Sequence, residues 1–340
     1  MSDVLDRIEE SLELAALTTI GLGGVARYFV DVSSSEDLQV ALDFADDKDL
    51  PVYILGGGSN TIFADEGFDG LVIRVRIGGI EWLEDGRVAV GAGEVWDDFV
   101  WQCVERGQAG VECLAGIPGL VGATPMQNVG AYGAQVADVI ERVEVLDRET
   151  GGVRWLSGEE CGFGYRTSRF KTTDAGRFVI LRVSFVLQPG GAVNIRYGEL
   201  SAVVGENAKD LRSVAEAVVG LRAKKSMIID EHDPHSRSCG SFFTNPVILE
   251  DAATVLQADF PEVRMFAVPE GAKVSAAWLV EQAGFAKGYK YKGVGVSENH
   301  SLALVNYGGT RAELLELAEM IRAAVQEKFG VWLLIEPVVV

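Results

Sequence analysis

The sequence is poor in histidine, cysteine and basic residues, and these shortages exclude several functions. It contains 3 histidines and 4 cysteines, and its 50 acidic residues outnumber 30 basic ones, so the formal net charge is −20 at pH 7. A chain this acidic repels phosphate backbones, and we therefore expect no nucleic-acid partner. A phosphorylated small molecule can still bind, because backbone amides and a few local cations suffice to hold it.

Long apolar runs and a basic leader are also missing. No apolar stretch approaches the roughly 18 residues of a membrane-spanning helix, so we expect no membrane insertion. The acidic segment 1–17 lacks the basic region and apolar core of a secretory signal, and its pattern predicts a helix. The cysteines form no CxxC pair, so we expect reduced thiols, a cytoplasmic location and, for Cys239, a buried packing role.

The length predicts two or three domains, since one hydrophobic core seldom serves 340 residues. The 48% hydrophobic and 24% charged residues are typical of a globular protein. The first third of the chain predicts strands at 26–32, 51–55 and 71–75, with a helix at 34–49. This alternation indicates a small α/β unit.

The middle of the chain is richer in β-structure. Strands are predicted at 87–93 and 178–191 and a hairpin at 142–157, with a helix at 95–107. A further unit is expected to begin near Met227. Its predicted elements are two amphipathic helices, a strand and an apolar C-terminal strand, at 276–284, 310–330, 301–308 and 331–340.

Two glycine-rich segments indicate ligand loops, and a third does not. GLGGVA at 21–26 matches a dinucleotide-binding pattern, but a β-type segment follows it where that motif needs a helix. GGGSN at 56–60 directly follows a predicted strand and forms either a tight turn or an anion-binding loop. Segment 116–133, GIPGLVGATPMQNVGAYG, is too rich in glycine for a helix and too apolar for a solvated loop. Two such loops in an acidic chain indicate a large phosphorylated cofactor.

Only a few polar residues have surroundings that fit a catalytic role. Arg166, beside an aromatic residue, is suited to polarise an anionic or carbonyl oxygen, whereas Arg169 and Lys171 fit a solvated patch. Glu336 interrupts an apolar strand, so it is either a buried acid with a raised pKa or an exposed edge residue. The H-x-x-H pattern at 232–235 lacks a third ligand, so we expect no metal site.

Ser241 and Lys225 are weaker signals. Ser241 precedes two aromatic residues and lies outside any G-x-S-x-G motif, so it could donate a proton at the rim of an aromatic pocket. Lys225 and nearby Arg222 lie at the predicted end of a helix, where the helix dipole is a sufficient explanation. Residue type alone selects neither.

Six motifs, taken in order, resemble one enzyme family. They are GGGSN, GIPGLVGATPMQNVGAYG, FGYRTSRFK, GSFFTNP, KVSAAWLVEQAG and the terminal IEP. The same order occurs in the UDP-N-acetylenolpyruvoylglucosamine reductases, also called UDP-N-acetylmuramate dehydrogenases. The resemblance extends from about Thr19 to Glu336, and Tyr197 in RYGEL is similar to the tyrosine of a subgroup with an extra loop. The ordered set is far more specific than any single motif.

The resemblance implies an α+β protein with an FAD-binding fold of the vanillyl-alcohol-oxidase (PCMH) type. Its FAD-binding subdomains would be 1–75 and 76–226, the second joined by the C-terminal strand 331–340, with an α/β substrate-binding domain at 227–330. The implied activity is NADPH-dependent reduction of UDP-N-acetylglucosamine enolpyruvate to UDP-N-acetylmuramate. That reaction belongs to peptidoglycan precursor synthesis, and hence to cell-wall biogenesis, cell shape, the cell cycle and cell division. A monomer is expected. FAD is expected to be bound non-covalently, because the presumed cofactor loops contain no histidine that could attach it.

The same resemblance assigns roles to individual residues. It implies that Ser241 protonates the substrate and that Arg166 and Glu336 stabilise or protonate an enolate-like intermediate. Substrate contacts are implied for Tyr165, Tyr197, Lys225, Asn245, Lys273 and His300, although Asn299 competes with His300 for a position that some relatives fill with glutamine. Cofactor contacts are implied for Gly56, Gly57, Gly58, Ser59, Asn60, Gly116, Pro118, Gly119, Gly122, Ala123, Gln127, Asn128, Gly130, Ala131 and Tyr132.

Two alternatives stay open beside this interpretation. One is another FAD-dependent oxidoreductase of the same fold that acts on a hydroxy acid or alcohol. The other is a non-catalytic nucleotide-binding protein. GSFFTNP and Glu336 disfavour the first, and the concurrence of Arg166, Ser241 and Glu336 with two cofactor loops disfavours the second.

Overall fold

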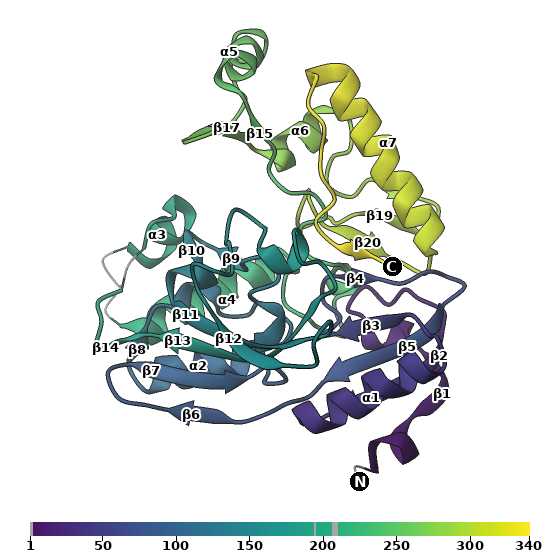
Figure 1. Ribbon diagram of the computed structural model, residues 1–340. Coiled ribbons are helices and arrows are strands. Elements are labelled where there is room, and N and C mark those ends of the chain that lie inside the picture. The colour runs from purple at the N-terminus through teal and green to yellow at the C-terminus, as the bar shows by residue number, and fades with distance from the viewer. Residues whose placement is uncertain (1–2, 194, 206–209) are drawn as a thin grey trace. The chain divides into compact units, whose positions relative to one another are not determined.

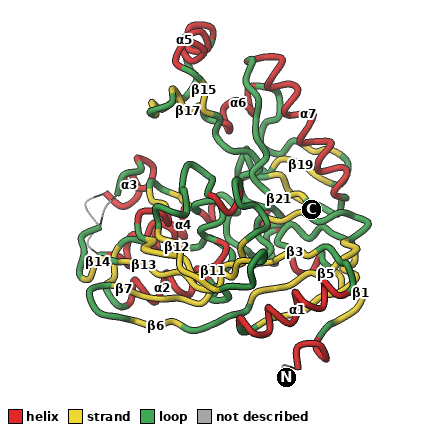
Figure 2. Tube along the Cα trace, in the orientation of Figure 1, coloured by secondary structure: helices red, strands yellow, loops and turns green. Residues whose placement is uncertain are grey.

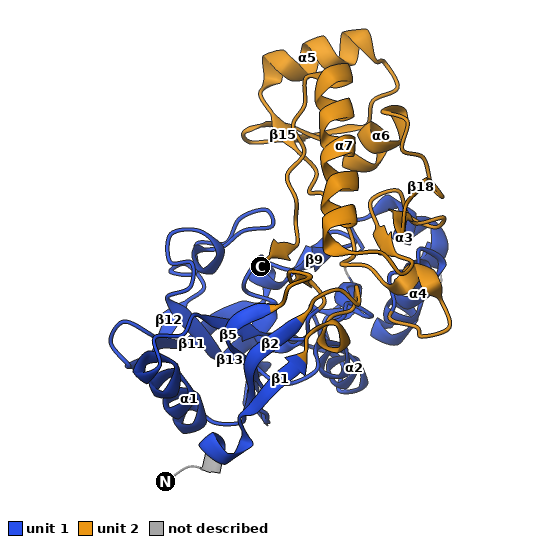
Figure 3. Cartoon of the chain, turned by 90° about the vertical axis from the view of Figure 1, so that its right-hand side faces the viewer, with its two compact units in different colours: residues 1–12, 25–58, 68–228 blue, residues 13–24, 59–67, 229–340 orange. Residues whose placement is uncertain are grey.

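The computed structural model describes residues 3–193, 195–205 and 210–340. The chain forms two compact units, each with its own apolar core and each mixing helices with strands (Figures 2 and 3). Unit 1 comprises residues 1–12, 25–58 and 68–228, and unit 2 comprises 13–24, 59–67 and 229–340. The mixed helix and strand content confirms the predicted α+β class.

The first sheet of unit 1 confirms the predicted α/β start. Its strand order is β1 (Glu9–Glu13), β2 (Val25–Val32), β5 (Phe68–Val75), β3 (Val52–Leu55), and both β2 and β3 run parallel to β5. Helix α1 (Ser35–Asp47) packs on β2 and β5 (Figure 1). The Ser34 side chain caps α1 by accepting a hydrogen bond from the Asp37 N–H.

The second sheet of unit 1 is antiparallel and contains the predicted hairpin. Its order is β12 (Val153–Ser157), β11 (Ile140–Asp147), β13 (Phe178–Val186), β7 (Arg87–Gly91), β6 (Ile80–Trp82). Helices α2 (Trp96–Glu105) and α4 (Leu211–Lys224) also belong to this unit. The buried rings of Trp96, Phe99 and Phe185 lie 5.2 to 6.1 Å apart and form the aromatic centre of its core.

The other elements of unit 1 are short because glycine-rich loops separate them. They are η1 (Asp3–Arg7), β8 (Gln108–Ala109), η3 (Glu112–Leu114), η4 (Val121–Ala123), β9 (Gly130–Ala131), β10 (Ala134–Gln135), η5 (Val136–Asp138), η6 (Arg169–Lys171), β14 (Gln188–Pro189) and α3 (Gly198–Val204). Segment 116–133 is thus mostly loop, as predicted.

Unit 2 is built around the helix α7 (Arg311–Phe329). A capping box joins Thr310 and Glu313 at its start, and Gly330 ends it with a φ of 67°, as the sequence predicts. The other elements are η2 (Ala15–Leu17), η8 (Pro234–Ser236), α5 (Glu250–Asp259), α6 (Ala276–Gln282), the sheet β15 (Val247–Ile248), β17 (Gly271–Val274), β16 (Met265–Val268), the sheet β18 (Lys290–Tyr291), β19 (Val294–Val296), β20 (Leu304–Asn306), and the pair β21 (Val338–Val339) with β4 (Thr61–Ile62).

The two chain ends differ from prediction. Segment 1–17 was predicted to be helical, but Glu9–Glu13 forms the edge strand β1, because pairing along β2 overrides the helix propensity of Glu and Leu. The C-terminal segment 331–340 contains only a two-residue strand after Pro337, and that strand pairs with β4. The predicted division into three domains stays a prediction. Within the described ranges, no helix combines the length and apolar character of a membrane span.

Candidate functional site

The two predicted cofactor loops are in direct contact. GGGSN follows β3, and Gly58 has a φ of 67°, which favours glycine. A Cβ atom on Gly57 would lie 2.7 Å from the Gly119 Cα, so only glycine permits this approach. In the same contact, a Cβ on Gly56 would lie 3.4 Å from the Ala123 Cβ. The first three residues of GGGSN belong to unit 1, and the last two belong to unit 2.

The same contact leaves hydrogen-bond donors available to a ligand. Among the described residues we find no acceptor for the backbone N–H groups of Gly57, Gly58 and Gly119. Successive backbone amides of this kind bind anions, and they add no formal charge to an acidic chain. The donor set therefore fits the pyrophosphate of FAD.

The beginning of segment 116–133 is anchored to the unit 1 scaffold. The Gly116 N–H donates to the Asp97 carboxylate at 2.6 Å, and Arg222 Nε donates to the Gly116 carbonyl at 3.0 Å. The Gly122 N–H donates to the Ala92 carbonyl at 2.9 Å, and a Cβ on Gly122 would lie 2.5 Å from the Ala92 Cβ. Packing alone is thus a sufficient reason for glycine at 122.

Arg222 contacts the predicted cofactor segment, and sequence reasoning missed this contact. Its guanidinium bonds the Gly116 and Met227 carbonyls, and burial lowers its pKa. Arg222 also lies in the last turn of α4, as the helix-dipole interpretation expects. The R-x-x-K spacing from Arg222 to Lys225 was the only signal for it, and that spacing cannot reveal a partner 106 residues away.

Arg166 lies at the other end of segment 116–133. It has a φ of 53°, and its Nη2 donates to the Gly130 carbonyl at 2.7 Å. Tyr165 is 43% exposed, and its ring centroid lies 5.6 Å from the Arg166 guanidinium carbon. Asn128 is buried beside this turn and donates to the Gly164 carbonyl at 3.0 Å.

Arg169 and Lys171 differ from the predicted solvated patch. Arg169 forms an ion pair with Asp174 at 2.8 Å, and Lys171 Nζ donates to Gln127 Oε1 at 3.4 Å. Lys171 thus fixes the side chain of a predicted cofactor residue.

Two predicted substrate residues of unit 1 meet around Tyr132. The rings of Tyr132 and Tyr197 lie 5.5 Å apart, nearly perpendicular, and Lys225 Nζ lies 5.9 Å from the Tyr132 centroid. Lys225 also forms an ion pair with Glu199 at 2.6 Å. Burial raises the pKa of Tyr132 to about 12, so the phenol stays protonated at neutral pH. Sequence reasoning gave no signal for Glu199.

Ser241 and Glu336 lie on neighbouring backbone segments of unit 2. The Glu336 N–H donates to the Phe242 carbonyl at 2.9 Å, and Phe243 bridges Ile335. The Ser241 and Glu336 side chains are both half-buried. The exposure of Glu336 therefore lies between the two interpretations that the sequence left open, a fully buried acid and an exposed edge residue.

The aromatic residues after Ser241 do not line an open pocket. Phe242 and Phe243 are fully buried, with ring centroids 5.3 Å apart, in the core of unit 2. They therefore fix the backbone that carries Ser241, because core packing holds them in place.

The remaining predicted residues of unit 2 have local structural contacts. Val338 N–H donates to the Asn60 carbonyl, and Ala276 N–H donates to Asn245 Oδ1, both at 2.9 Å. Lys273, on β17, pairs with Val247 and Phe266 across its sheet. His300 Nδ1 accepts a hydrogen bond from the Leu302 N–H at 3.0 Å, so its neutral ring carries the proton on Nε2. Asn299 N–H donates to Ser297 Oγ at 3.1 Å.

The cysteines and histidines supply no competing site. Burial raises the pKa of Cys239 to about 12, which agrees with its predicted packing role. His235 Nδ1 lies 2.9 Å from the Tyr307 hydroxyl. Within the described part of the chain, no three His, Cys, Asp or Glu side chains form a group that could hold a metal ion.

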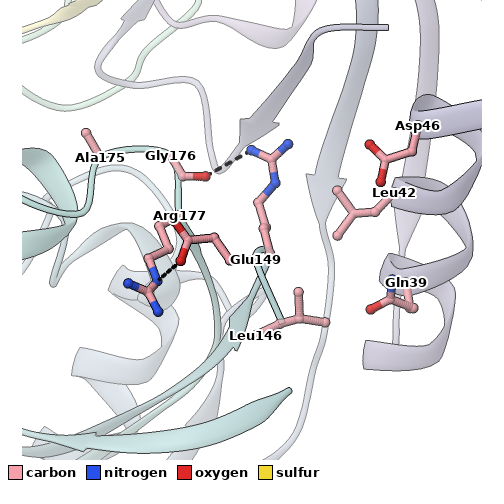
Figure 4. Close-up of a pocket in the computed structure, with 9 residues that line it drawn as sticks. Gln39, Leu42, Asp46, Leu146, Glu149, Ala175, Gly176 and Arg177 are labelled. Atoms are coloured by element: carbon pink, nitrogen blue, oxygen red, sulfur yellow. Dashed lines mark hydrogen bonds and ion pairs between the residues drawn. The ribbon is translucent and has the colours of Figure 1, made fainter. Parts of the chain in front are cut away.

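A separate polar pocket of about 370 Å³ lies on unit 1 (Figure 4). Its charged groups partly satisfy one another: Arg148 donates to the Gly176 carbonyl at 3.0 Å, and Arg177 pairs with Glu149 at 3.3 Å. It shares no residue with the predicted cofactor and substrate sites. The lining residues are Gln39, Leu42, Asp46, Leu146, Arg148, Glu149, Ala175, Gly176 and Arg177.

Two family models match this chain. Residues 26–157 match the family model of an FAD binding domain. Residues 232–340 match that of the UDP-N-acetylenolpyruvoylglucosamine reductase C-terminal domain. The FAD-binding match confirms that part of the predicted fold.

Near full-length relatives agree with these matches. The UDP-N-acetylenolpyruvoylglucosamine reductase of Thermobifida fusca is 46% identical and covers 97% of both chains. That of Mycobacterium tuberculosis is 44% identical and covers 98% of this chain and 95% of the relative. The crystal structure of UDP-N-acetylenolpyruvylglucosamine reductase from Thermus caldophilus is 28% identical, with a TM-score of 0.67 and 98% of both chains covered.

Proposed function

Because the chain belongs to the UDP-N-acetylenolpyruvoylglucosamine reductase family, we propose that it reduces UDP-N-acetylglucosamine enolpyruvate to UDP-N-acetylmuramate. The reductant is NADPH, and FAD is bound without a covalent link. The observation that carries this proposal is the 46% identity to such a reductase over 97% of both chains. The product is a peptidoglycan precursor, and the enzyme acts as a cytoplasmic monomer.

FAD, when bound, would supply the hydride-transfer chemistry between NADPH and the enolpyruvyl carbon β to the carboxylate. The amides of Gly57, Gly58 and Gly119 support pyrophosphate binding because their donors are available. Asn60, Gln127 and the other residues predicted from segments 56–60 and 116–133, with the exception of the Asn128 side chain, complete that cofactor site.

The protein's own side chains complete the reduction. Ser241 gives its hydroxyl proton to the carbon α to the carboxylate, so that one hydride and one proton together saturate the double bond. Arg166 and Glu336 act on the enolate-like charge that develops between these two additions. The neighbouring backbones of residues 241–243 and 335–336 support joint action of Ser241 and Glu336.

Substrate binding is proposed for residues of both units. Tyr165, Tyr197 and Lys225 belong to unit 1, and their grouping around Arg166 and Tyr132 supports this role. In unit 2 the proposed substrate contacts are Asn245, Lys273 and His300.

The two half-reactions test the function directly. Purified protein should be yellow and release FAD on denaturation; anaerobic NADPH should bleach it, and UDP-N-acetylglucosamine enolpyruvate should restore the colour. Stopped-flow absorbance follows both steps. A folded protein that takes up no FAD would refute the proposal, whereas reoxidation by hydroxy acids in place of the enolpyruvyl ether would identify another oxidoreductase of this fold.

A further inference from the structure

Two stretches of unit 1, 126–130 and 164–168, are tied together at three points. The first belongs to the glycine-rich segment, and the second carries Arg166. Each contact joins a side chain of one stretch to a backbone carbonyl of the other: Asn128 Nδ2 to Gly164 (3.0 Å), Arg166 Nη2 to Gly130 (2.7 Å) and Ser168 Oγ to Met126 (2.6 Å).

The Asn128 side chain is committed to protein contacts. It is 2% exposed, and its two amide hydrogens go to the Gly164 carbonyl at 3.0 Å and to Gln135 Oε1 at 3.1 Å. Its Oδ1 accepts from the Ala137 N–H at 3.0 Å. Its φ of 48° lies in the left-handed region, which Asn tolerates better than most residues. These contacts favour a structural task over side-chain contact with the cofactor.

The turn that carries Arg166 needs outside support. Gly164 and Thr167 exchange backbone hydrogen bonds of 3.0 and 3.4 Å around it, and Arg166 has a φ of 53°. This conformation is unfavourable for an L-residue with a side chain and persists only where the surroundings enforce it. The Gly164 carbonyl closes the turn and also receives the Asn128 amide, so Asn128 fixes the turn at its start.

We propose that Asn128 is a positioning residue for Arg166. It holds the 164–167 turn through Gly164 and ties that turn to the backbone of the glycine-rich segment. Arg166 therefore depends on Asn128 for its place relative to that segment. This inference rests on the proposed function in one respect: it assumes that Arg166 acts in the second half-reaction, the reoxidation of the flavin by the enolpyruvyl substrate.

Asn128→Asp tests this role with an isosteric side chain. Oδ1 can still accept from Ala137, but the second oxygen faces the Gly164 carbonyl and cannot donate. Because the variant loses a buried hydrogen bond to the turn, reoxidation by the enolpyruvyl substrate should slow roughly 10- to 100-fold. Reduction by NADPH should stay near the wild-type rate, and the FAD dissociation constant, measured by fluorescence titration, should change much less.

A double-mutant cycle separates positioning from general damage. In an Arg166→Ala background, Asn128→Asp should slow reoxidation little further, because the group that it positions is already absent. Gln135→Ala is the matched control, since it removes the exposed partner of Asn128 and leaves Gly164 untouched. Ser168→Ala removes the hydrogen bond to the Met126 carbonyl at the opposite end of the turn. If urea unfolding shows that Asn128→Asp does not fold, Ser168→Ala takes its place in the test.

If Asn128→Asp reoxidised at the wild-type rate, the inference would be overturned. It would also be overturned if Asn128→Asp slowed reoxidation by the same factor in the wild-type and Arg166→Ala backgrounds. Failure of the proposed function is distinguishable, because wild-type protein would then itself fail to reoxidise with the enolpyruvyl substrate.

Discussion

Single residues in the candidate site adopt backbone conformations that few side chains favour. Among the residues that the structure describes, Asn128, Tyr132 and Arg166 are three of the eight non-glycine residues with positive φ, with φ of 48°, 49° and 53°. Such conformations concentrate where tertiary contacts enforce a particular side-chain direction. Glycine patterns in the sequence mark the loops, but they do not reveal these three residues as left-handed.

Ser241→Ala separates the two half-reactions. NADPH should still bleach the flavin at about the wild-type rate, since the role proposed for Ser241 concerns only the enolpyruvyl substrate. Reoxidation should fall by roughly 100-fold or more, because a positioned proton donor typically contributes 10²–10⁴. Stopped-flow absorbance of the flavin measures both steps. Reoxidation at the wild-type rate would show that Ser241 is not the proton donor.

Glu199→Gln should tighten substrate binding. Glu199 pairs with Lys225 at 2.6 Å, and the two side chains are 39% and 29% exposed. In the substrate-binding role proposed for Lys225, an anionic substrate group takes the place of this carboxylate beside the lysine. A partly exposed pair is worth about 0–1 kcal/mol, so KM for the UDP-sugar should fall up to about fivefold at low salt. The difference should shrink as salt rises. Glu216→Gln is the control, and a raised KM in Glu199→Gln would indicate that Glu199 orients Lys225.

At the scale of secondary-structure elements, the ends of α7 and of the β11–β12 hairpin are held by carboxylates. The Arg311 and Ala312 N–H groups donate to Asp65 at 2.8 and 3.2 Å, beside the Thr310 cap. In the hairpin, Asp147 accepts from Arg177 Nη2 at 2.7 Å. At the α7 N-terminus, the Asp65 carboxylate accepts from backbone N–H groups that have no partner within the helix. At the hairpin, the Asp147 carboxylate pairs with the Arg177 guanidinium.

Asp65→Ala and Thr310→Ala should each destabilise unit 2 by about 1 kcal/mol, because each removes an acceptor for N–H groups at the α7 N-terminus. Urea unfolding followed by far-ultraviolet circular dichroism measures the change. Glu327→Gln, near the C-terminal end of the same helix, should be neutral or slightly stabilising, since it removes a negative charge from the negative end of the helix dipole. Equal loss in all three variants would contradict the capping role.

Asp147→Asn should give a pH-dependent loss of stability. The hydrogen bond from Arg177, above all, lowers the pKa of Asp147. A carboxylate whose folded-state pKa lies below its unfolded value of about 3.9 stabilises the fold fully above that value. The stabilisation disappears as the pH falls through the folded-state pKa. The difference in urea midpoint between wild type and Asp147→Asn should therefore be largest at pH 7 and shrink progressively as the pH is lowered below about 3.9.

The whole molecule shows which features a sequence can reveal. Local signals predict α1, α7, the β11–β12 hairpin and the two glycine-rich loops, since caps, alternation and glycine content act over a few residues. Strand β1 (Glu9–Glu13) escapes prediction, because its own residues favour a helix and only pairing with β2 makes it a strand. Segments 13–24 and 59–67 join unit 2, although both lie among the strands of unit 1 in the sequence.

The residues of the candidate site also fall into those that the sequence could predict and those that it could not. Its loops could be predicted from composition, and Ser241, Arg166 and Glu336 from ordered motifs. Arg222 and Glu199 could not, because their partners are remote in sequence: Gly116 lies 106 residues from Arg222, and Lys225 lies 26 residues from Glu199. Only the folded chain determines those pairs.

The thiols of the whole molecule should be inert while it is folded. All four cysteines are buried, three of them in the core of unit 1 and Cys239 in the core of unit 2. Burial raises the pKa of Cys113, Cys161 and Cys239 to about 12 and that of Cys103 further, so thiolate is scarce at pH 8. A charged aromatic disulfide reagent should therefore release almost no chromophore from native protein and four equivalents after denaturation. Rapid labelling of one thiol in the folded chain would show that the core around that thiol opens. Mass spectrometry of the labelled peptide would then identify the cysteine and therefore the unit whose core opens.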